Sequence, residues 1–392
     1  MGGLSGHMTH VYEDYNLKMK DVKNIISGIL NSQIQLKEKV DGFNIHVSYR
    51  DGELRFYRNK TDIKNGGMSI GDMLERWKDN PKALKVYLSA AKYLEPYIKS
   101  IEPIFVSGND NITITLNVEC VNGLTNVIPY KGTSVYIHNK WIWNGEDVVA
   151  ICDVPDDFSG KFERVFKCPI LRFNEYYPLS DNQANNMSGL FISRLFISGA
   201  FISEAFISEF ENVTGKESDD CTLYDYYYKN FINYAANHFE MNWVCDSPVR
   251  KALFERIFSG VCSGESSINN LSKYHDKNMI KTWLTQYSKV IKDDCIRDLR
   301  MFFVRFGNFI MSQLDGYVNY EDRYFISDLL YKNYLSKPKS IYDQLLKQTG
   351  YQFNALEGVV FKYSLCDTPN PESRLYKLTG SFEFINKAMW GE

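Results

Sequence analysis

Four residues near the start of the chain, Lys39-Val40-Asp41-Gly42, place an amine beside a carboxylate and a glycine. Further along the chain, Glu119 closes an alternating segment, Glu357 precedes an apolar segment ending in Lys362, and Lys377 follows. A lysine amine attacks phosphorus only after losing its proton, which nearby cations or burial promote by lowering its pKa. Carboxylates bind divalent metal ions, and glycine lets the backbone approach a nucleotide closely. The set predicts a site where a lysine attacks the α-phosphorus of a nucleoside triphosphate.

The segments that carry these residues have the composition of β-strands. Asp51-Gly52 predicts a hairpin turn, and alternation over 111–121 places Thr113, Thr115, Asn117 and Glu119 on one face of a strand. Strands are predicted for 34–40, 43–49, 53–58, 103–107, 111–121, 133–144, 147–153, 357–363 and 373–379.

Helical periodicity dominates the middle of the chain. Helices are predicted for 20–31, 69–99, 222–239, 248–260, 278–316, 322–335 and 340–349. The simplest arrangement is an α+β fold in which residues 9–175 and 350–392 form one domain. Residues 176–349 would form a mostly helical insertion.

A five-residue pattern repeats between residues 190 and 209, each copy containing Phe-Ile-Ser. Five residues advance a helix by about 140° beyond one turn, so the phenylalanines would not share a helix face. The period fits one coil of a pentapeptide β-helix, although such arrays usually need several stacked units. The alternative is a locally duplicated segment that is buried or faces a partner.

Composition limits the class of protein. The net charge of −3 creates no global positive field, so any groove for nucleic acid must be local. The eight cysteines form no C-x-x-C pair, which argues against structural zinc and favours free thiols in a reducing compartment, the cytoplasm. Residues 1–8 resemble the remnant of an expression tag, and no apolar run is long enough to predict a membrane span.

Taken in order, the motifs resemble those of the covalent nucleotidyltransferase superfamily of ATP-dependent DNA ligases, RNA ligases and mRNA capping enzymes. The residues from Lys39 to Gly42 are similar to its K-x-D-G motif, Glu119 to the glutamate of its third motif, and 357–362 to its fourth motif. Lys377 resembles the lysine of the fifth motif. The resemblance implies an ATP-grasp-like adenylation domain of antiparallel sheets, interrupted here by the helical insertion.

The resemblance also implies a role for each matched residue. Lys39 would carry the nucleotide, Glu357 and Glu119 would bind Mg²⁺ or Mn²⁺, and Asn44 would contact the substrate end. The residues implied in ATP binding are Asp41, Gly42, Arg58, Glu119, Tyr136, Lys362 and Lys377.

Three features bear on the substrate. The fifth motif has one lysine, in Lys377-Leu378-Thr379, where the family usually has K-x-K, and the sequence leaves no room for a C-terminal OB domain. Asn44 extends the first motif to K-x-D-G-x-N, which is similar to phage nick-sealing RNA ligases. These features predict an RNA ligase-like enzyme of a phage or another virus, acting in the host cytoplasm.

Such an enzyme would join 5′-phosphate to 3′-hydroxyl ends, with RNA favoured over DNA. One alternative is a GTP-using capping-type or protein-modifying nucleotidyltransferase. Another is a nucleotide-binding structural or interaction protein with reduced catalysis, as the single lysine of the fifth motif would permit. The helical insertion would bind nucleic acid or a protein partner.

Overall fold

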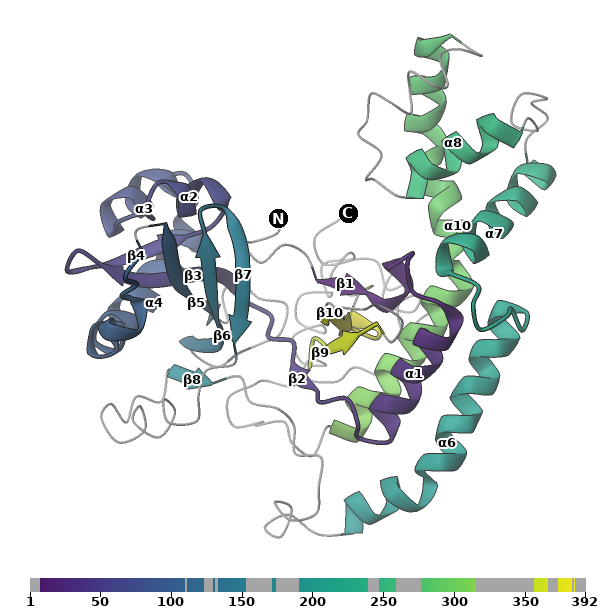
Figure 1. Cartoon of the computed structure of the whole chain (residues 1–392), viewed down its shortest axis with the longest axis horizontal. Coiled ribbons are helices and arrows are strands. Elements are labelled where there is room, and N and C mark those ends of the chain that lie inside the picture. The colour runs from purple at the N-terminus through teal and green to yellow at the C-terminus, as the bar shows by residue number, and fades with distance from the viewer. Residues whose placement is uncertain are drawn as a thin grey trace, which may run out of the picture.

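The computed structural model describes most of the chain as an α+β protein with two β-sheets (Figure 1). The described residues are 8–109, 111–122, 130, 133–152, 171–173, 190–238, 247–258, 276–314, 356–365, 373–382 and 384.

The larger sheet has the strand order β4-β3-β5-β6-β7, with β8 also paired to β6. Its strands are β3 (Phe43–Arg50), β4 (Glu53–Tyr57), β5 (Ile112–Asn122), β6 (Thr133–Asn144), β7 (Asp147–Cys152) and β8 (Leu171–Phe173). The pairs are antiparallel except β6–β8. Asp51 and Gly52 have positive φ angles of 56° and 79°, as a tight hairpin turn requires, so the predicted β3–β4 hairpin is confirmed.

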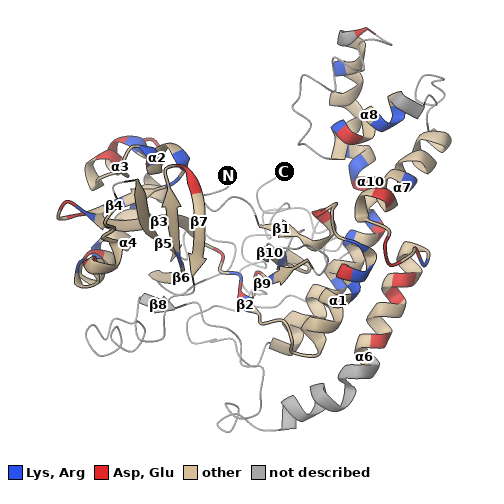
Figure 2. Cartoon of the chain, in the orientation of Figure 1, with Lys and Arg blue, Asp and Glu red and all other residues tan. Residues whose placement is uncertain are grey.

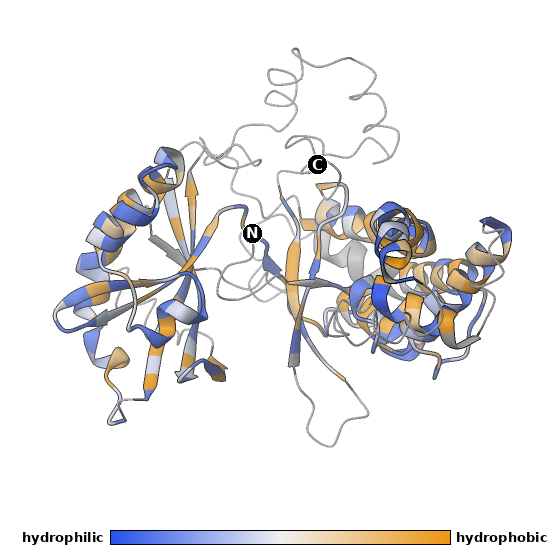
Figure 3. Ribbon diagram, turned by 90° about the horizontal axis from the view of Figure 1, so that it is seen from above, coloured by the Kyte–Doolittle hydropathy of each residue, from blue (hydrophilic) through white to orange (hydrophobic). Residues whose placement is uncertain are grey.

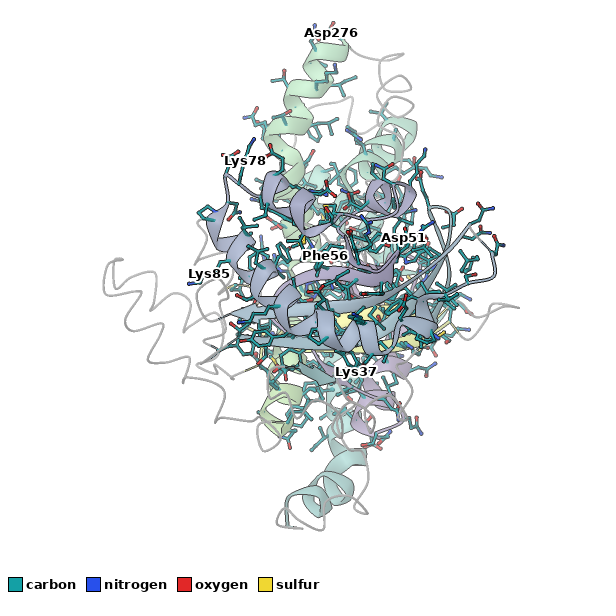
Figure 4. The ribbon with its side chains drawn as sticks, turned by 90° about the vertical axis from the view of Figure 1, so that its left-hand side faces the viewer. Lys37, Asp51, Phe56, Lys78, Lys85 and Asp276 are labelled. Atoms are coloured by element: carbon teal, nitrogen blue, oxygen red, sulfur yellow. The ribbon has the colours of Figure 1, made fainter. Side chains whose placement is uncertain are left out.

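Helices cover one face of the larger sheet. They are α2 (Lys60–Lys64), α3 (Ile70–Arg76), α4 (Pro81–Ser100) and the 3₁₀ helix η2 (Glu102–Phe105). Alternate residues such as Val47, Leu116 and Ile137 pack against α4 in one hydrophobic core. Figure 4 shows these helices in front of the sheet, with Lys78 and Lys85 pointing outward. The opposite face of the sheet therefore receives the polar residues of the same strands.

The smaller sheet joins segments that are far apart in the sequence, in the order β1-β10-β9-β2. Its strands are β1 (Thr9–His10), β2 (Lys37–Glu38), β9 (Val359–Ser364) and β10 (Ser373–Leu378). The pair β1–β10 is parallel, and the pairs β9–β10 and β2–β9 are antiparallel.

The smaller sheet shares its hydrophobic core with helices from both the early and the middle parts of the chain. These are η1 (Val11–Glu13), α1 (Met19–Leu30), α6 (Leu190–Thr214), α7 (Leu223–His238), α8 (Ser247–Phe258) and α10 (Lys277–Leu314). Phe361 and Tyr376 face this core, whereas Lys362 and Lys377 lie on the other face of the sheet. The two sheets lie between two groups of helices in both Figure 1 and Figure 3.

The structure corrects four local predictions. The helix predicted over 69–99 is two helices, α3 and α4, interrupted at 77–80. Within 34–40 only Lys37 and Glu38 form a strand, and η2 replaces the strand predicted at 103–107. The repeat at 190–209 lies in α6, so the β-helix hypothesis is wrong. In α6, Phe206 and Phe210 are one helical turn apart and contact Phe302 of α10, so the five-residue period does not set the buried face.

The remaining helical predictions at 222–239, 248–260 and 278–316 are confirmed as α7, α8 and α10, within a few residues at their ends. The helices predicted at 322–335 and 340–349 lie outside the described residues. The division into 9–175 with 350–392 and an insertion of 176–349 stays a prediction. None of the described helices combines the length and apolar character needed to cross a bilayer.

Candidate active site

Lys39 and Glu357 form the centre of the candidate site, although 318 residues separate them. The ammonium Nζ of Lys39 donates a hydrogen bond to Oε1 of Glu357, and the two groups form an ion pair. The backbone N–H of Lys39 donates to the carbonyl of Gly358 at 2.8 Å, directly beyond the β2–β9 ladder. The pairing of two short strands therefore places the predicted nucleophile beside the predicted metal-binding acid.

The pair lies in a strongly acidic environment. Burial lowers the pKa of Lys39, but the carboxylates of Glu357, Glu119 and Asp41 together outweigh burial and raise it above its ordinary value. Burial raises the pKa of Glu357 to about 8, against the opposing effect of Lys39. Lys39 is therefore held as an ammonium ion in this state, so the amine must lose a proton before it can attack.

Gly42 brings the predicted acidic residues close to the lysine motif. A Cβ atom on Gly42 would lie 2.7 Å from Cγ of Glu119 and 2.8 Å from the carbonyl oxygen of Cys120. These separations are shorter than side chains tolerate, so only glycine allows β3 to begin this close to β5. The glycine of the first motif therefore packs directly against the glutamate of the third.

Glu119 and Asn44 are cross-strand partners on the polar face of the larger sheet. Nδ2 of Asn44 lies 3.2 Å from Oε2 of Glu119 and 2.5 Å from Oδ1 of Asn117. Thr115 and Asn117 are buried on the same face, as the alternation predicted. Asn44 thus orients the Glu119 carboxylate from the neighbouring strand.

Arg58 follows β4 and reaches the same network. Its guanidinium donates to the carbonyl of Asn44, and its backbone N–H donates to Oδ2 of Asp62 at 2.7 Å. The buried Asp62 also accepts from the N–H of Asn59 and pairs with Arg76 at 2.9 Å. The start of α2 therefore fixes Arg58 beside Asn44.

Three further predicted residues lie on the two sheets around this centre. Tyr136 is the cross-strand partner of Glu119 and is 7 % exposed. Lys362 and Lys377 are half-buried and share the face of the smaller sheet that is turned away from its helices. The register makes them diagonal neighbours, because Lys362 pairs with Leu375.

A divalent metal ion fits part of this donor set. Within the part of the chain that the structure describes, Oε2 of Glu357 is buried without a hydrogen-bond partner, although a buried carboxylate oxygen normally has one. Among the described residues, no three His, Cys, Asp or Glu side chains are grouped closely enough to bind a metal ion by themselves. Mg²⁺ commonly uses one or two carboxylates together with water and substrate phosphates, and Glu357 with Glu119 would supply them.

Tyr130 and Lys37 were not singled out from the sequence, and His138 was expected to be a structural histidine on a strand. Tyr130 Oη accepts the backbone N–H of Asp41 at 3.3 Å, and His138 Nε2 lies 3.7 Å from Glu119 Oε2. Lys37 opens β2 two residues before Lys39, so alternation places the two side chains toward the same side of the sheet. Lys37 carried a signal, because alternation relates it to Lys39; Tyr130 is one of 27 tyrosines and carried none.

Figure 2 shows charged residues of both signs along α10 and at the start of α1. Near the site, Arg55 pairs with Glu53 at 3.2 Å and Lys64 with Glu146 at 3.7 Å. Arg55 and Lys64 are therefore balanced by acids, whereas Arg58 contacts the carbonyl of Asn44.

Comparison with known proteins adds no family assignment. No model of a protein family matches this chain, and a search of curated proteins finds no match.

Proposed function

We propose that the chain is an ATP-dependent nucleotidyltransferase that carries AMP on Lys39 and joins nucleic-acid ends. The observation that carries the proposal is the pairing of Lys39 with the buried Glu357, whose second oxygen has no hydrogen-bond partner among the described residues. Most buried carboxylate oxygens in proteins do have a partner. One oxygen of Glu357 contacts the proposed nucleophile, and the other would be available to a metal ion. This arrangement fits transfer of a nucleotidyl group.

In the first reaction, Lys39 Nζ attacks the α-phosphorus of ATP. A nitrogen–phosphorus bond forms, the bond to the β-phosphate oxygen breaks, and pyrophosphate leaves with the displaced electron pair. Oε1 of Glu357 is hydrogen-bonded to Nζ and is therefore in position to accept the proton that the ammonium must lose. A bound Mg²⁺ or Mn²⁺ would neutralise phosphate charge at the carboxylates of Glu357 and Glu119.

The later steps use the polar face of the larger sheet. AMP passes from Lys39 to a 5′-phosphate end, and a 3′-hydroxyl then displaces AMP to form the new phosphodiester bond. Arg58 supplies a positive charge beside Asn44, where the substrate end would bind. RNA is the favoured substrate because the first motif continues to Asn44.

Incubation with α-labelled ATP and Mg²⁺, followed by denaturation, tests the first reaction. We expect label on the wild type and on Lys85→Ala, an exposed lysine of α4, and none on Lys39→Ala or Lys39→Arg. Equal labelling of Lys39→Arg and wild type would exclude Lys39 as the nucleophile. Label from GTP but not ATP would favour the capping-type alternative.

Joining is tested separately with singly labelled strands. We expect the wild type to join an RNA 3′-hydroxyl to a 5′-phosphate, and a 5′-hydroxyl strand to remain unjoined. With α-labelled ATP in place of labelled strands, transfer of label to a second protein rather than to nucleic acid would favour the protein-modifying alternative. Nucleotide binding without labelled protein would favour the structural alternative.

A further inference from the structure

Helix α10 contacts the end of β10 through a buried amide. Nδ2 of Asn308 donates to Oγ of Ser381 at 2.7 Å, and Oδ1 of Asn308 accepts the backbone N–H of Ser381 at 2.8 Å. Asn308 is 7 % exposed and Ser381 is 2 % exposed. Breaking these bonds would leave polar groups buried, so they hold the two segments together strongly.

The backbones of the two segments also touch. A Cβ on Gly307 would lie 2.8 Å from the backbone nitrogen of Gly380, and one on Gly380 would lie 2.4 Å from Oδ1 of Asn308. Gly380 has a φ of +48°, which favours glycine. Because neither glycine has a side chain, the backbone of α10 lies directly against the backbone of this turn.

The other side of the turn presses on the candidate site. A Cβ on Gly358 would lie 2.2 Å from the carbonyl oxygen of Leu378 and 2.9 Å from Cα of Thr379. Gly358 accepts the backbone N–H of Lys39 at 2.8 Å, and its neighbour Glu357 pairs with the Lys39 ammonium. Four backbone segments therefore stand in direct succession: α10, the turn at 379–381, Gly358 and Lys39.

Glycine contacts make this succession stiff. Flexible side chains absorb small shifts between packed elements, but backbone in contact with backbone transmits them. Group transfer is sensitive to such shifts, because a misplacement of about 1 Å can cost about 100-fold in rate. The position of α10 therefore bears on the reactivity of Lys39.

We infer that Asn308 is a positioning residue for transfer of the nucleotide to Lys39, and that α10 forms a structural wall behind the site. The inference rests on the proposed function. It assigns the helical region a part in the first reaction in addition to any part in binding substrates.

Asn308→Ala tests the inference, with Asn230→Ala as the matched control. Asn230 of α7 also anchors an amide on α10, because its Nδ2 donates to the carbonyl of Cys295 at 3.1 Å, but it does not contact the turn. We expect Asn308→Ala to slow single-turnover labelling at saturating ATP by about 10- to 100-fold. The control should label at the wild-type rate, even if both variants lower the melting temperature.

Hydrogen exchange at the amide of Lys39 gives a second readout that needs no activity. The amide should exchange faster in Asn308→Ala than in Asn230→Ala, because its acceptor on Gly358 would be less firmly held. Wild-type rates of labelling and exchange in folded Asn308→Ala would overturn the inference. If Asn308→Ala does not fold, Ser381→Ala, which keeps the backbone bond to Asn308, decides by the same two readouts.

Failure of the inference and failure of the proposed function give different results. An unlabelled wild-type protein overturns the proposed function, and exchange at Lys39 then still decides whether α10 holds the lysine. A labelled wild type with an equally fast Asn308→Ala overturns only the role of Asn308.

Discussion

The two sheets are assembled in opposite ways. The strands β3 to β7 of the larger sheet and its helices come from the segment 43–152, with β8 at 171–173 added, whereas the smaller sheet joins strands at 9–10, 37–38, 359–364 and 373–378. The larger sheet carries Glu119, Asn44 and Tyr136, while Lys39 and Glu357 depend on the smaller one. The comparison teaches that local folding prepares a polar surface and that distant pairing brings Lys39, the proposed nucleophile, to it.

The largest effect is expected from breaking the distant pairing. Gly358→Ala would place a methyl group 2.2 Å from the carbonyl of Leu378, so we expect a loss of about 3 kcal/mol in unfolding free energy and about 100-fold slower labelling. Urea unfolding and labelling with α-labelled ATP would measure both.

Gly52→Ala is the counterpart in the larger sheet. Gly52 has a positive φ of 79° and no neighbouring atom within 4 Å of its Cβ position, so only backbone strain of about 1 kcal/mol is expected. Labelling by the folded protein should be unchanged. Similar labelling losses in the two alanine variants would contradict the assignment of the nucleophile to the smaller sheet.

The larger sheet should show its own dependence on pH through His46. Burial lowers the pKa of His46 to about 3, with smaller contributions from His138 and Arg58, against 6.5 for an unperturbed histidine. Between these values the unfolded chain binds the proton and the folded protein does not, so stability is full above pH 6.5 and falls as pH falls. The expected loss is about 1.4 kcal/mol per pH unit.

His46→Asn removes the titrating group and keeps a polar atom for Thr115, which bonds Nδ1 of His46 at 2.9 Å. Urea unfolding between pH 7 and pH 5 should show that acidification destabilises the wild type more than the variant. The difference between the two slopes isolates His46 from Glu357, whose raised pKa acts in the opposite direction. An identical slope would show that His46 does not titrate in this range.

Asn44→Ala should separate the chemical steps. Loss of the amide removes the contacts to Glu119 and Asn117, which costs about 1 to 2 kcal/mol in stability. We expect end joining to fall about 10-fold more than labelling of Lys39. The proposed role of Asn44 is to contact the substrate end, and a lost charge-assisted contact costs about 1.5 kcal/mol or more. Labelling and end joining would be measured in parallel. Equal fold-losses in the two assays would show that Asn44 acts on Lys39 and not on the substrate end.

The smallest effect is expected from Lys37→Ala. Lys37 opens β2, and alternation places its side chain on the same side as that of Lys39. Removing its partly exposed charge should raise the KM for ATP about two- to fivefold, since such charges contribute up to about 1 kcal/mol. Lys85→Ala, exposed on α4 in Figure 4, is the control of equal charge and size. Equal KM values in the two variants would exclude Lys37 from the ATP site.

The sequence predicted the parts of the fold that depend on neighbouring residues. Asp51-Gly52 specified its turn, and alternation placed Thr115, Asn117 and Glu119 together. The predictions failed where packing decides the structure. The 3₁₀ helix η2 at 102–105 replaces the strand predicted at 103–107, and only two residues near Lys39 pair with β9. The β-helix reading of α6 failed because it relied on strict periodicity, which a helix rich in apolar residues does not need.

The residues of the candidate site were predicted mainly from the order of the motifs, and less from alternation or composition. The order of the motifs brought Lys39 and Glu357 to attention, and the structure places them in contact. The Asn308 contact had no local signal, because an asparagine inside a long helix gives no indication of the turn it will meet.

The separation of 318 residues between Lys39 and Glu357 has a consequence in time. At a synthesis rate of about 5 to 20 residues per second, Lys39 would be made roughly 16 to 60 seconds before its acidic partner. Throughout that interval the nascent chain has the lysine without the carboxylate that orients it. Reactivity at Lys39 would thus begin late in translation, only after β2 has paired with β9.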